Sequence, residues 1–144
     1  MLLNISSSKG LISTAVALMS LLMISTEVAA TATALNNKKF NKSWVVFQPH
    51  TYSRTFNHLD DFADALLAFD NIIVTDIYAA REVNTYNISS EDLVNAIIKL
   101  GKDAKYIPSL EDCASYLKQN VQNDDIVLTL GAGTVTNIGP MIIN

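Results

Sequence analysis

The sequence predicts an α/β domain, a Rossmann-like, mostly parallel sheet with helices on both faces, preceded by an irregular or helical N-terminal extension. From residue 41 onward, short runs of β-branched and aromatic residues alternate with segments whose apolar residues recur at helical spacing. The connections between the strands are long enough for the β-α-β crossovers that parallel strands require. The run 71–77 has the consecutive apolar residues Ile72, Ile73 and Val74, which is typical of a strand covered on both faces.

Residue type and spacing predict where the individual helices and strands begin and end. Pro49 lacks the N–H needed for strand pairing and therefore ends the first strand. Apolar residues within 57–69 fall on one helical face. Pro140 shortens or kinks the last helix. The expected elements are, in chain order, strand 43–47, helix 57–69, strand 71–77, a loop over 78–89, a helix to about Leu100, strand 105–108, a helix to about Val121, strand 125–130 and the short final helix.

Capping residues mark the ends of two of these helices. Ser89 or Ser90 caps the helix that Gly101 stops, because serine side chains accept from free helix N–H groups and glycine adopts the left-handed conformation that ends a helix. Ser109 with Asp112 resembles a capping box in which Asp replaces the usual Glu.

Size and composition suit one domain with a real core, since the chain has 144 residues of which 49% are hydrophobic and only 17% are charged. The net charge of −4 and the lack of a basic cluster argue against a nucleic-acid partner. The single cysteine, Cys113, excludes an internal disulfide and a cysteine-based metal site, and its apolar helical position predicts a buried, inert thiol.

Residues 1–34 differ from the α/β domain expected over 35–144. They resemble a signal peptide, with Lys9 in the positively charged start, an apolar run over 11–24 and a small-residue cleavage site at Ala32-Thr33-Ala34. The run is too short and too rich in Ser and Thr for a membrane-spanning helix, so we do not expect a membrane partner. The alternatives are a segment that never folds and a segment that is not native to the original reading frame of the gene.

Polar loops follow three of the predicted strands, at 48–55, 76–82 and 131–134. If the strands are parallel, all three loops lie at the same edge of the sheet. Ligands of open α/β sheets bind at this edge, outside the carboxyl ends of the strands. The sequence therefore predicts a binding site where these three loops converge.

The first loop carries the main candidates. Arg54 offers a planar guanidinium that suits a carboxylate or a phosphate, and its alternative role is a local ion pair with Asp60 or Asp61. His50 either contacts an anion or a ligand, or is a hydrogen-bonded turn histidine after proline. His58, at a helix start, is interpreted as solvated.

The other two loops have supporting candidates. Asp76, Arg81 and Glu82 favour an internal ion pair that shapes their loop. Gly131 and Gly133 either expose backbone N–H groups to an anion or make a tight strand-to-helix turn, which is the default interpretation. Neither a Walker-type loop nor a GxGxxG motif is present, and no cluster of metal ligands is recognisable.

Four ordered motifs carry a family resemblance. They are VFQPHTYSRT at 46–55, DIYAARE at 76–82, SSEDL at 89–93 and DIVLTLGAG at 125–133. Over residues 26–144 the chain resembles the C-terminal domain of the UDP-N-acetylmuramate-L-alanine ligases, a branch of the Mur ligase family of peptidoglycan synthesis.

The resemblance implies a reaction. ATP phosphorylates the carboxylate of UDP-N-acetylmuramate, Mg²⁺ neutralises the phosphates, and the amine of L-alanine attacks the acyl phosphate to give an amide. The C-terminal domain closes over a central ATPase domain. On this resemblance Arg54 would hold the alanine carboxylate, while His50 and Tyr52 would line the closed site. The family works in the cytoplasm, where ATP and UDP-sugars are found.

The chain also differs from the family at several points. Some family members carry Arg at the position of Thr51, and many carry Asp at the position of Thr134. The phosphate-binding loop, the Mg²⁺ ligands and the UDP-sugar domain of the family lie upstream of the matched region. No complete catalytic set is therefore expected here, ATP and Mg²⁺ are not expected to bind this chain alone, and the chain is expected to be inactive without a separately encoded ATPase domain.

The segment just before the matched region motivates the hypothesis that residues 1–25 are an out-of-frame translation of a ligase gene or result from a mis-assigned start. Thr26-Glu27-Val28 agrees with the family, but an Asp-Asp-Tyr-containing segment is expected before it. Codons for Asp-Asp-Tyr read one base out of phase give Leu22-Met23-Ile24. Two other interpretations stay open, namely a stand-alone α/β binding module and a secreted α/β domain exported through residues 1–34.

Overall fold

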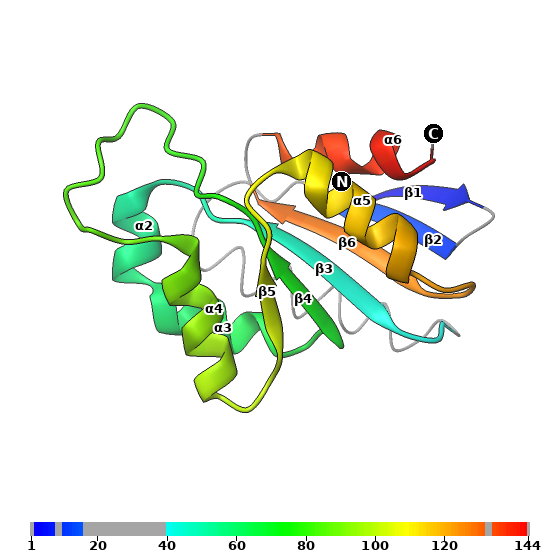
Figure 1. Cartoon of the computed structure of the whole chain (residues 1–144), viewed down its shortest axis with the longest axis horizontal. Coiled ribbons are helices and arrows are strands. Elements are labelled where there is room, and N and C mark those ends of the chain that lie inside the picture. Colours follow the sequence, from blue (N-terminus) through cyan, green and yellow to red (C-terminus); the bar gives the residue numbers. More distant parts are fainter. Residues whose placement is uncertain (1, 8–9, 16–39, 132–133, 144) are drawn as a thin grey trace.

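A computed structural model describes residues 2–7, 10–15, 40–131 and 134–143. Its centre is a six-stranded sheet in the order β1-β2-β6-β3-β4-β5 (Figure 1). The strands are β1 Leu2–Ser7, β2 Gly10–Ala15, β3 Ser43–Gln48, β4 Asn71–Val74, β5 Ala104–Tyr106 and β6 Ile126–Gly131. The helices are α2 Tyr52–Asn57, α3 Leu59–Leu66, α4 Ser90–Lys99, α5 Leu110–Asn120, the 3-10 helix η1 Val135–Asn137 and α6 Ile138–Ile143.

The strands β3, β4, β5 and β6 pair in parallel throughout. Phe47 lies beside Val74 on one side and beside Leu130 on the other, and Gln48 lies beside Gly131. This register brings the carboxyl ends of β3, β4 and β6 to one edge of the sheet. The predicted parallel α/β fold is confirmed.

Helices cover both faces of this sheet (Figure 1). Alternate side chains of a strand point to opposite faces, so Val45 and Phe47 pack with α3 and α4, while Trp44 and Val46 pack with α5 and α6. The first cluster takes Phe62, Leu66, Leu93 and Ile97 from its helices, and the second takes Cys113, Leu117, Ile138 and Ile142. Cys113 is buried, and burial raises the pKa of its thiol to about 12, as expected of an inert cysteine.

The expectation of an irregular or helical N-terminal extension is wrong for the two stretches that the structure describes. β1 and β2 form an antiparallel hairpin, and β2 pairs in parallel with β6 from Leu11 beside Ile126 to Thr14 beside Thr129. The physical reason is that β6 has an edge not paired by β3, and β2 supplies the hydrogen-bonding partner. The rest of the predicted apolar run, the proposed cleavage site and the boundary at residue 34 lie outside the described residues.

One helix was not expected. The predicted loop 48–55 contains the start of α2, and the predicted helix 57–69 begins instead as a separate helix after His58. Thr51 starts α2, because its carbonyl accepts from the amide and the hydroxyl of Thr55. Of the six residues of α2 only Thr55 is buried, so the sequence has no apolar periodicity to reveal this helix.

The predicted caps of α4 and α5 are present. Asp92 accepts from the Ser89 amide at 2.8 Å, and Gly101 follows α4 with a φ of +91°. Ser109 accepts from the Asp112 amide at 3.1 Å at the start of α5. Within the described part of the chain, no helix combines the length and the apolar character needed to cross a membrane.

Candidate functional site

The three polar loops meet at the carboxyl edge of the sheet, as the sequence predicted. The loop after β3 leads into α2, the loop after β4 spans residues 75–89, and the turn after β6 leads into η1. The first two loops pair directly, since His50 and Tyr78 form a parallel bridge. The Thr51 amide donates to the Tyr78 carbonyl at 2.8 Å, and the Tyr78 amide donates to the Pro49 carbonyl at 2.8 Å.

Thr51 adopts a strained backbone conformation at this bridge, with φ 62° and ψ 148°. A β-branched residue rarely occupies this region, and such strain costs about 1–3 kcal/mol. The hydrogen bonds that the Thr51 amide and carbonyl make to Tyr78 and Thr55 hold it there. Strain maintained by surrounding contacts is concentrated at ligand-binding turns, so the conformation of Thr51 marks this turn as a functional candidate.

Arg54 lies in the first turn of α2 and is half-buried. The Thr51 hydroxyl accepts from its backbone amide at 3.4 Å. The local ion pair with Asp60 or Asp61 is not formed: among the described residues the only ion pair within 4.0 Å joins His58 Nδ1 to Asp61 Oδ2, at 3.6 Å. This leaves the Arg54 guanidinium without a carboxylate partner in the described part of the chain.

His50 stacks against Tyr78 with ring centroids 5.7 Å apart, and its Nδ1 is buried without a hydrogen-bond partner among the described residues. Burial and then the positive charge of Arg54 lower the pKa of His50 below 6.5, while Glu82 opposes the shift. His50 is therefore a neutral imidazole at pH 7.

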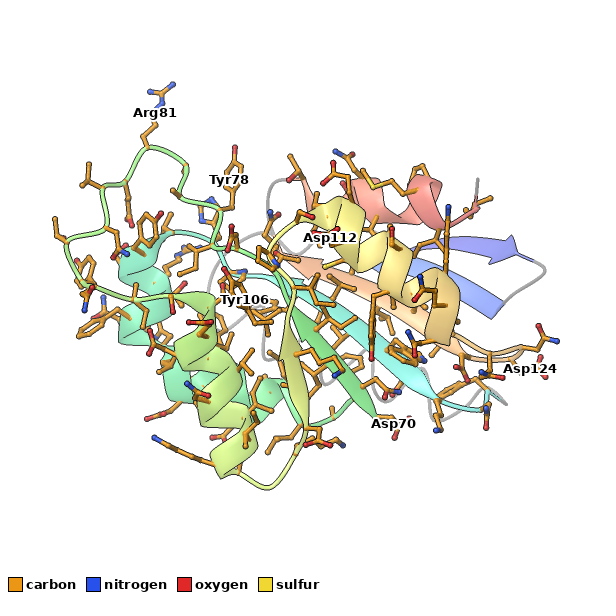
Figure 2. The ribbon with its side chains drawn as sticks, viewed as in Figure 1. Asp70, Tyr78, Arg81, Tyr106, Asp112 and Asp124 are labelled. Carbon is orange, nitrogen blue, oxygen red and sulfur yellow. The ribbon has the colours of Figure 1, made fainter. Side chains whose placement is uncertain are left out.

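The internal ion pair expected from Asp76, Arg81 and Glu82 is not formed. Figure 2 shows Arg81 at the tip of its loop, directed away from the sheet. Glu82 instead accepts from the amide of Ser53 at 2.9 Å and from its hydroxyl. These bonds lower the pKa of Glu82. Asp76 accepts a hydrogen bond from the hydroxyl of Tyr106, at the end of β5.

The side chain of Gln48 accepts hydrogen bonds from the turn that follows β6. Gln48 Oε1 accepts from the amides of Thr134 and Val135, each at 3.1 Å. Gly131 has φ +136°, and a side chain there would place Cβ 2.4 Å from the Gln48 carbonyl oxygen. The amides of Thr134 and Val135 are therefore not free to bind an anion, which favours the interpretation of this segment as a tight turn. Gly133 lies outside the described residues.

Sequence reasoning missed four residues of this edge. Gln48 and Ser53 lie in the motif at 46–55, but no role was predicted for them. Thr51 was considered only as a position where some family members carry Arg. The fourth, Tyr106, ends a short strand whose carboxyl end lies beside the site. The available signal was position, since each is a polar side chain at or just after the end of a strand of the parallel sheet.

Comparison with known proteins decides the family. Residues 25–133 match the family model described as Mur ligase, glutamate ligase domain. The chain belongs to the Mur ligase family. The resemblance drawn from the four motifs is confirmed, because relatives at 42–49% identity are UDP-N-acetylmuramate-L-alanine ligases.

Two relatives illustrate how much of a Mur ligase this chain represents. The ligase of Agathobacter rectalis is 46% identical over 114 residues, which are 79% of this chain and 25% of that protein. The ligase of Caldanaerobacter subterraneus subsp. tengcongensis is 49% identical over 113 residues, which are 78% of this chain and 25% of that protein. The chain thus spans about a quarter of the length of these relatives and corresponds to their C-terminal part.

A solved structure supports the same fold. The UDP-N-acetylmuramate-alanine ligase of Thermotoga maritima superimposes with a TM-score of 0.71 at 19% identity, over 96% of this chain and 27% of that one. The Mur ligase C-terminal α/β architecture predicted for the chain is therefore confirmed.

Proposed function

We propose that this chain is the amino-acid-binding C-terminal domain of an ATP-dependent UDP-N-acetylmuramate-L-alanine ligase of peptidoglycan synthesis. The main support is the placement of Arg54: a guanidinium on a strained, doubly anchored turn, at the sheet edge where the other motif loops converge. The names of the relatives support the choice of L-alanine and UDP-N-acetylmuramate as substrates.

In this proposal Arg54 binds the carboxylate of L-alanine through two parallel N–H···O bonds. Binding at the carboxylate leaves the amine at the other end of the amino acid for attack on an activated acyl group. His50 is neutral at pH 7, so it adds no charge beside the guanidinium and is available to donate or accept one hydrogen bond. Tyr52, at the start of α2, contributes to the wall of the same site.

ATP and Mg²⁺ are proposed to act in the part of the ligase upstream of this domain, where ATP converts the sugar carboxylate to an acyl phosphate. The described residues do not fit these groups: they contain no set of three His, Cys, Asp or Glu side chains able to hold a metal. Gln48 also occupies the amides of Thr134 and Val135, which a phosphate would need. The contribution proposed for this domain is therefore the positioning of the amino acid.

We also propose that the chain acts in the cytoplasm and depends on a central ATPase domain. Export through residues 1–34 is the alternative, and mass spectrometry of the mature N-terminus separates the two: an intact Met1 supports the first, and cleavage near Ala34 supports the second. Purified alone, the chain is expected to show no ATP-dependent alanine ligation.

The deciding experiment measures the KM for L-alanine in a chimeric ligase. Residues 35–144 would replace the C-terminal quarter of the Caldanaerobacter ligase, and ligation would be assayed with ATP, Mg²⁺, UDP-N-acetylmuramate and L-alanine. Arg54→Lys is expected to raise the KM for L-alanine about tenfold or more, because it loses one charge-assisted hydrogen bond. Arg81→Lys, at the exposed loop tip, is the matched control. If the chimera is active and Arg54→Lys leaves its KM for L-alanine unchanged, the assignment is wrong.

A further inference from the structure

A cavity of about 250 Å³ lies at the carboxyl ends of β4 and β5, next to the Arg54 turn. Its wall includes Tyr52 from the start of α2, Asp76 from the end of β4, Asn84 and Ser89 from the 75–89 loop, and Tyr106 from β5. Figure 2 places Tyr106 close to the end of the sheet, below the loop that carries Tyr78 and Arg81. The comparisons and the proposed function assign no role to this cavity.

Several polar groups of the wall are already engaged. Asn84 donates from Nδ2 to the Ile88 carbonyl at 2.9 Å and accepts from the Ile88 amide at 3.3 Å. Ser90 donates from its hydroxyl to the Thr75 carbonyl, and Ser89 donates to the carboxylate that caps α4. These bonds hold the wall in place but leave few groups for a ligand.

Asp76 is the main group left for a ligand. Its amide donates to the Pro108 carbonyl at 3.2 Å, which fixes the backbone, and Tyr106 donates to its Oδ1. That hydrogen bond, followed by burial, raises the pKa of Tyr106 to about 12, so the phenol stays protonated and keeps donating to the carboxylate. Oδ2 of Asp76 takes part in no hydrogen bond among the described residues.

Asp76 is the one charged side chain among the described residues that line the cavity. No lysine, arginine or histidine is among its described lining residues, and Glu91 lies near enough to Tyr106 to add to the negative potential. An anionic ligand would be repelled. A hard divalent cation needs six or more oxygen ligands, which a single free carboxylate does not provide. A group that donates several hydrogen bonds and carries one positive charge fits both constraints.

We propose that this cavity binds the ammonium group of a small primary amine, held by Asp76 and the hydroxyl oxygens of Tyr52 and Tyr106. An ammonium has three donors and no acceptor, which complements a carboxylate oxygen and two phenol oxygens. The cavity shares Tyr52 with the site proposed for L-alanine, but Arg54, which is proposed to hold the alanine carboxylate, is not among its described lining residues.

The test is a titration of the full chain with ethylammonium chloride, followed by ¹H–¹⁵N NMR. We expect saturable shifts of the amides of Asp76, Tyr106 and Ser90, and about tenfold weaker binding in Asp76→Asn, which loses the charge but keeps the shape. The matched control is Asp103→Asn, an exposed carboxylate that makes no hydrogen bond in the described residues and lies outside this cavity. It is expected to bind like the wild type.

The ligand can be varied as well, so the result does not depend on the folding of a variant. Ethanol is nearly the same size but neutral, and propionate carries the opposite charge; neither is expected to shift these three amides. If ethylammonium leaves them unchanged, or if ethanol shifts them equally, the proposal is wrong. The proposed function fails separately, when Arg54→Lys leaves the alanine KM of the chimera unchanged.

Discussion

Glu82 caps the start of α2 from a loop 29 residues away. Its Oε2 accepts from the amide of Ser53 at 2.9 Å, and its Oε1 accepts from the hydroxyl of the same residue. A carboxylate at a helix N-terminus satisfies N–H groups that have no partner within the helix. Together with the bridge between His50 and Tyr78, this contact joins the β3 and β4 loops into one unit that carries Arg54.

Glu82→Gln tests this cap. The variant keeps the size of the side chain but loses the charge, so we expect faster hydrogen exchange of the Ser53 amide with little change in global stability. Because the bonds from Ser53 lower the pKa of Glu82 below 4.5, the cap is fully present above that pH in the wild type and is lost as the pH falls further. NMR of the Ser53 amide across acid pH is the measurement.

The acid transition of the Ser53 amide, compared between two variants, provides the control for this prediction. The Ser53 amide should lose its acid transition in Glu82→Gln, while Asp112→Gln, at the start of α5, should leave that transition in place. An unchanged transition in Glu82→Gln would show that another group titrates there.

The pKa of His50 gives a second prediction. In the wild type it should lie below 6.5, because burial and Arg54 both disfavour the charged form. A lowered histidine pKa means that the unfolded chain binds the proton more tightly, so this contribution to stability is present above pH 6.5 and is lost as the pH falls below it. NMR titration of the imidazole Cε1 proton measures the value.

Two variants should move this pKa in opposite directions. Arg54→Ala removes a positive neighbour and should raise it, whereas Glu82→Gln removes a negative neighbour and should lower it further. Shifts of the same sign in both variants would mean that a change in burial, and not charge, controls the titration.

The sequence was informative about the parallel core and about individual caps. The apolar strands β3, β4 and β6 and the capping residues Ser89 and Ser109 follow from residue type and spacing alone, because each depends on neighbours in the chain. The three-loop convergence then follows from parallel topology.

What remained hidden depends on contacts between distant residues. Gln48 holds the amide of Thr134, 86 positions away, and Glu82 caps a helix that has no apolar face of its own. Neither partner could be chosen from the sequence, which offers several equivalent carboxylates and amides. The ion pair expected for Arg81 failed for the same reason, because proximity in the sequence did not make the pair in space.

Thr51→Gly addresses the strain in the Arg54 turn. Glycine adopts a positive φ without steric cost, so the variant is expected to unfold at higher urea. Its free energy of unfolding should rise by about 1 kcal/mol once the loss of the cap and the greater entropy of glycine in the unfolded chain are subtracted from the relieved strain. Thr85→Gly, in the exposed loop, is the control and should be slightly destabilising. A destabilised Thr51→Gly would show that the hydroxyl contributes more than the strain costs.

The paired variants Gly131→Ala and Gly101→Ala separate steric clash from backbone strain. Both glycines have positive φ, but a Cβ at Gly131 would lie 2.4 Å from the Gln48 carbonyl oxygen, whereas nothing lies within 4 Å at Gly101. That carbonyl belongs to β3, paired with β6, so neither strand has room to shift. We expect losses of about 3 kcal/mol for Gly131→Ala and about 1 kcal/mol for Gly101→Ala in urea unfolding. Equal losses would contradict the close approach of β3 and β6 at the edge that carries the site.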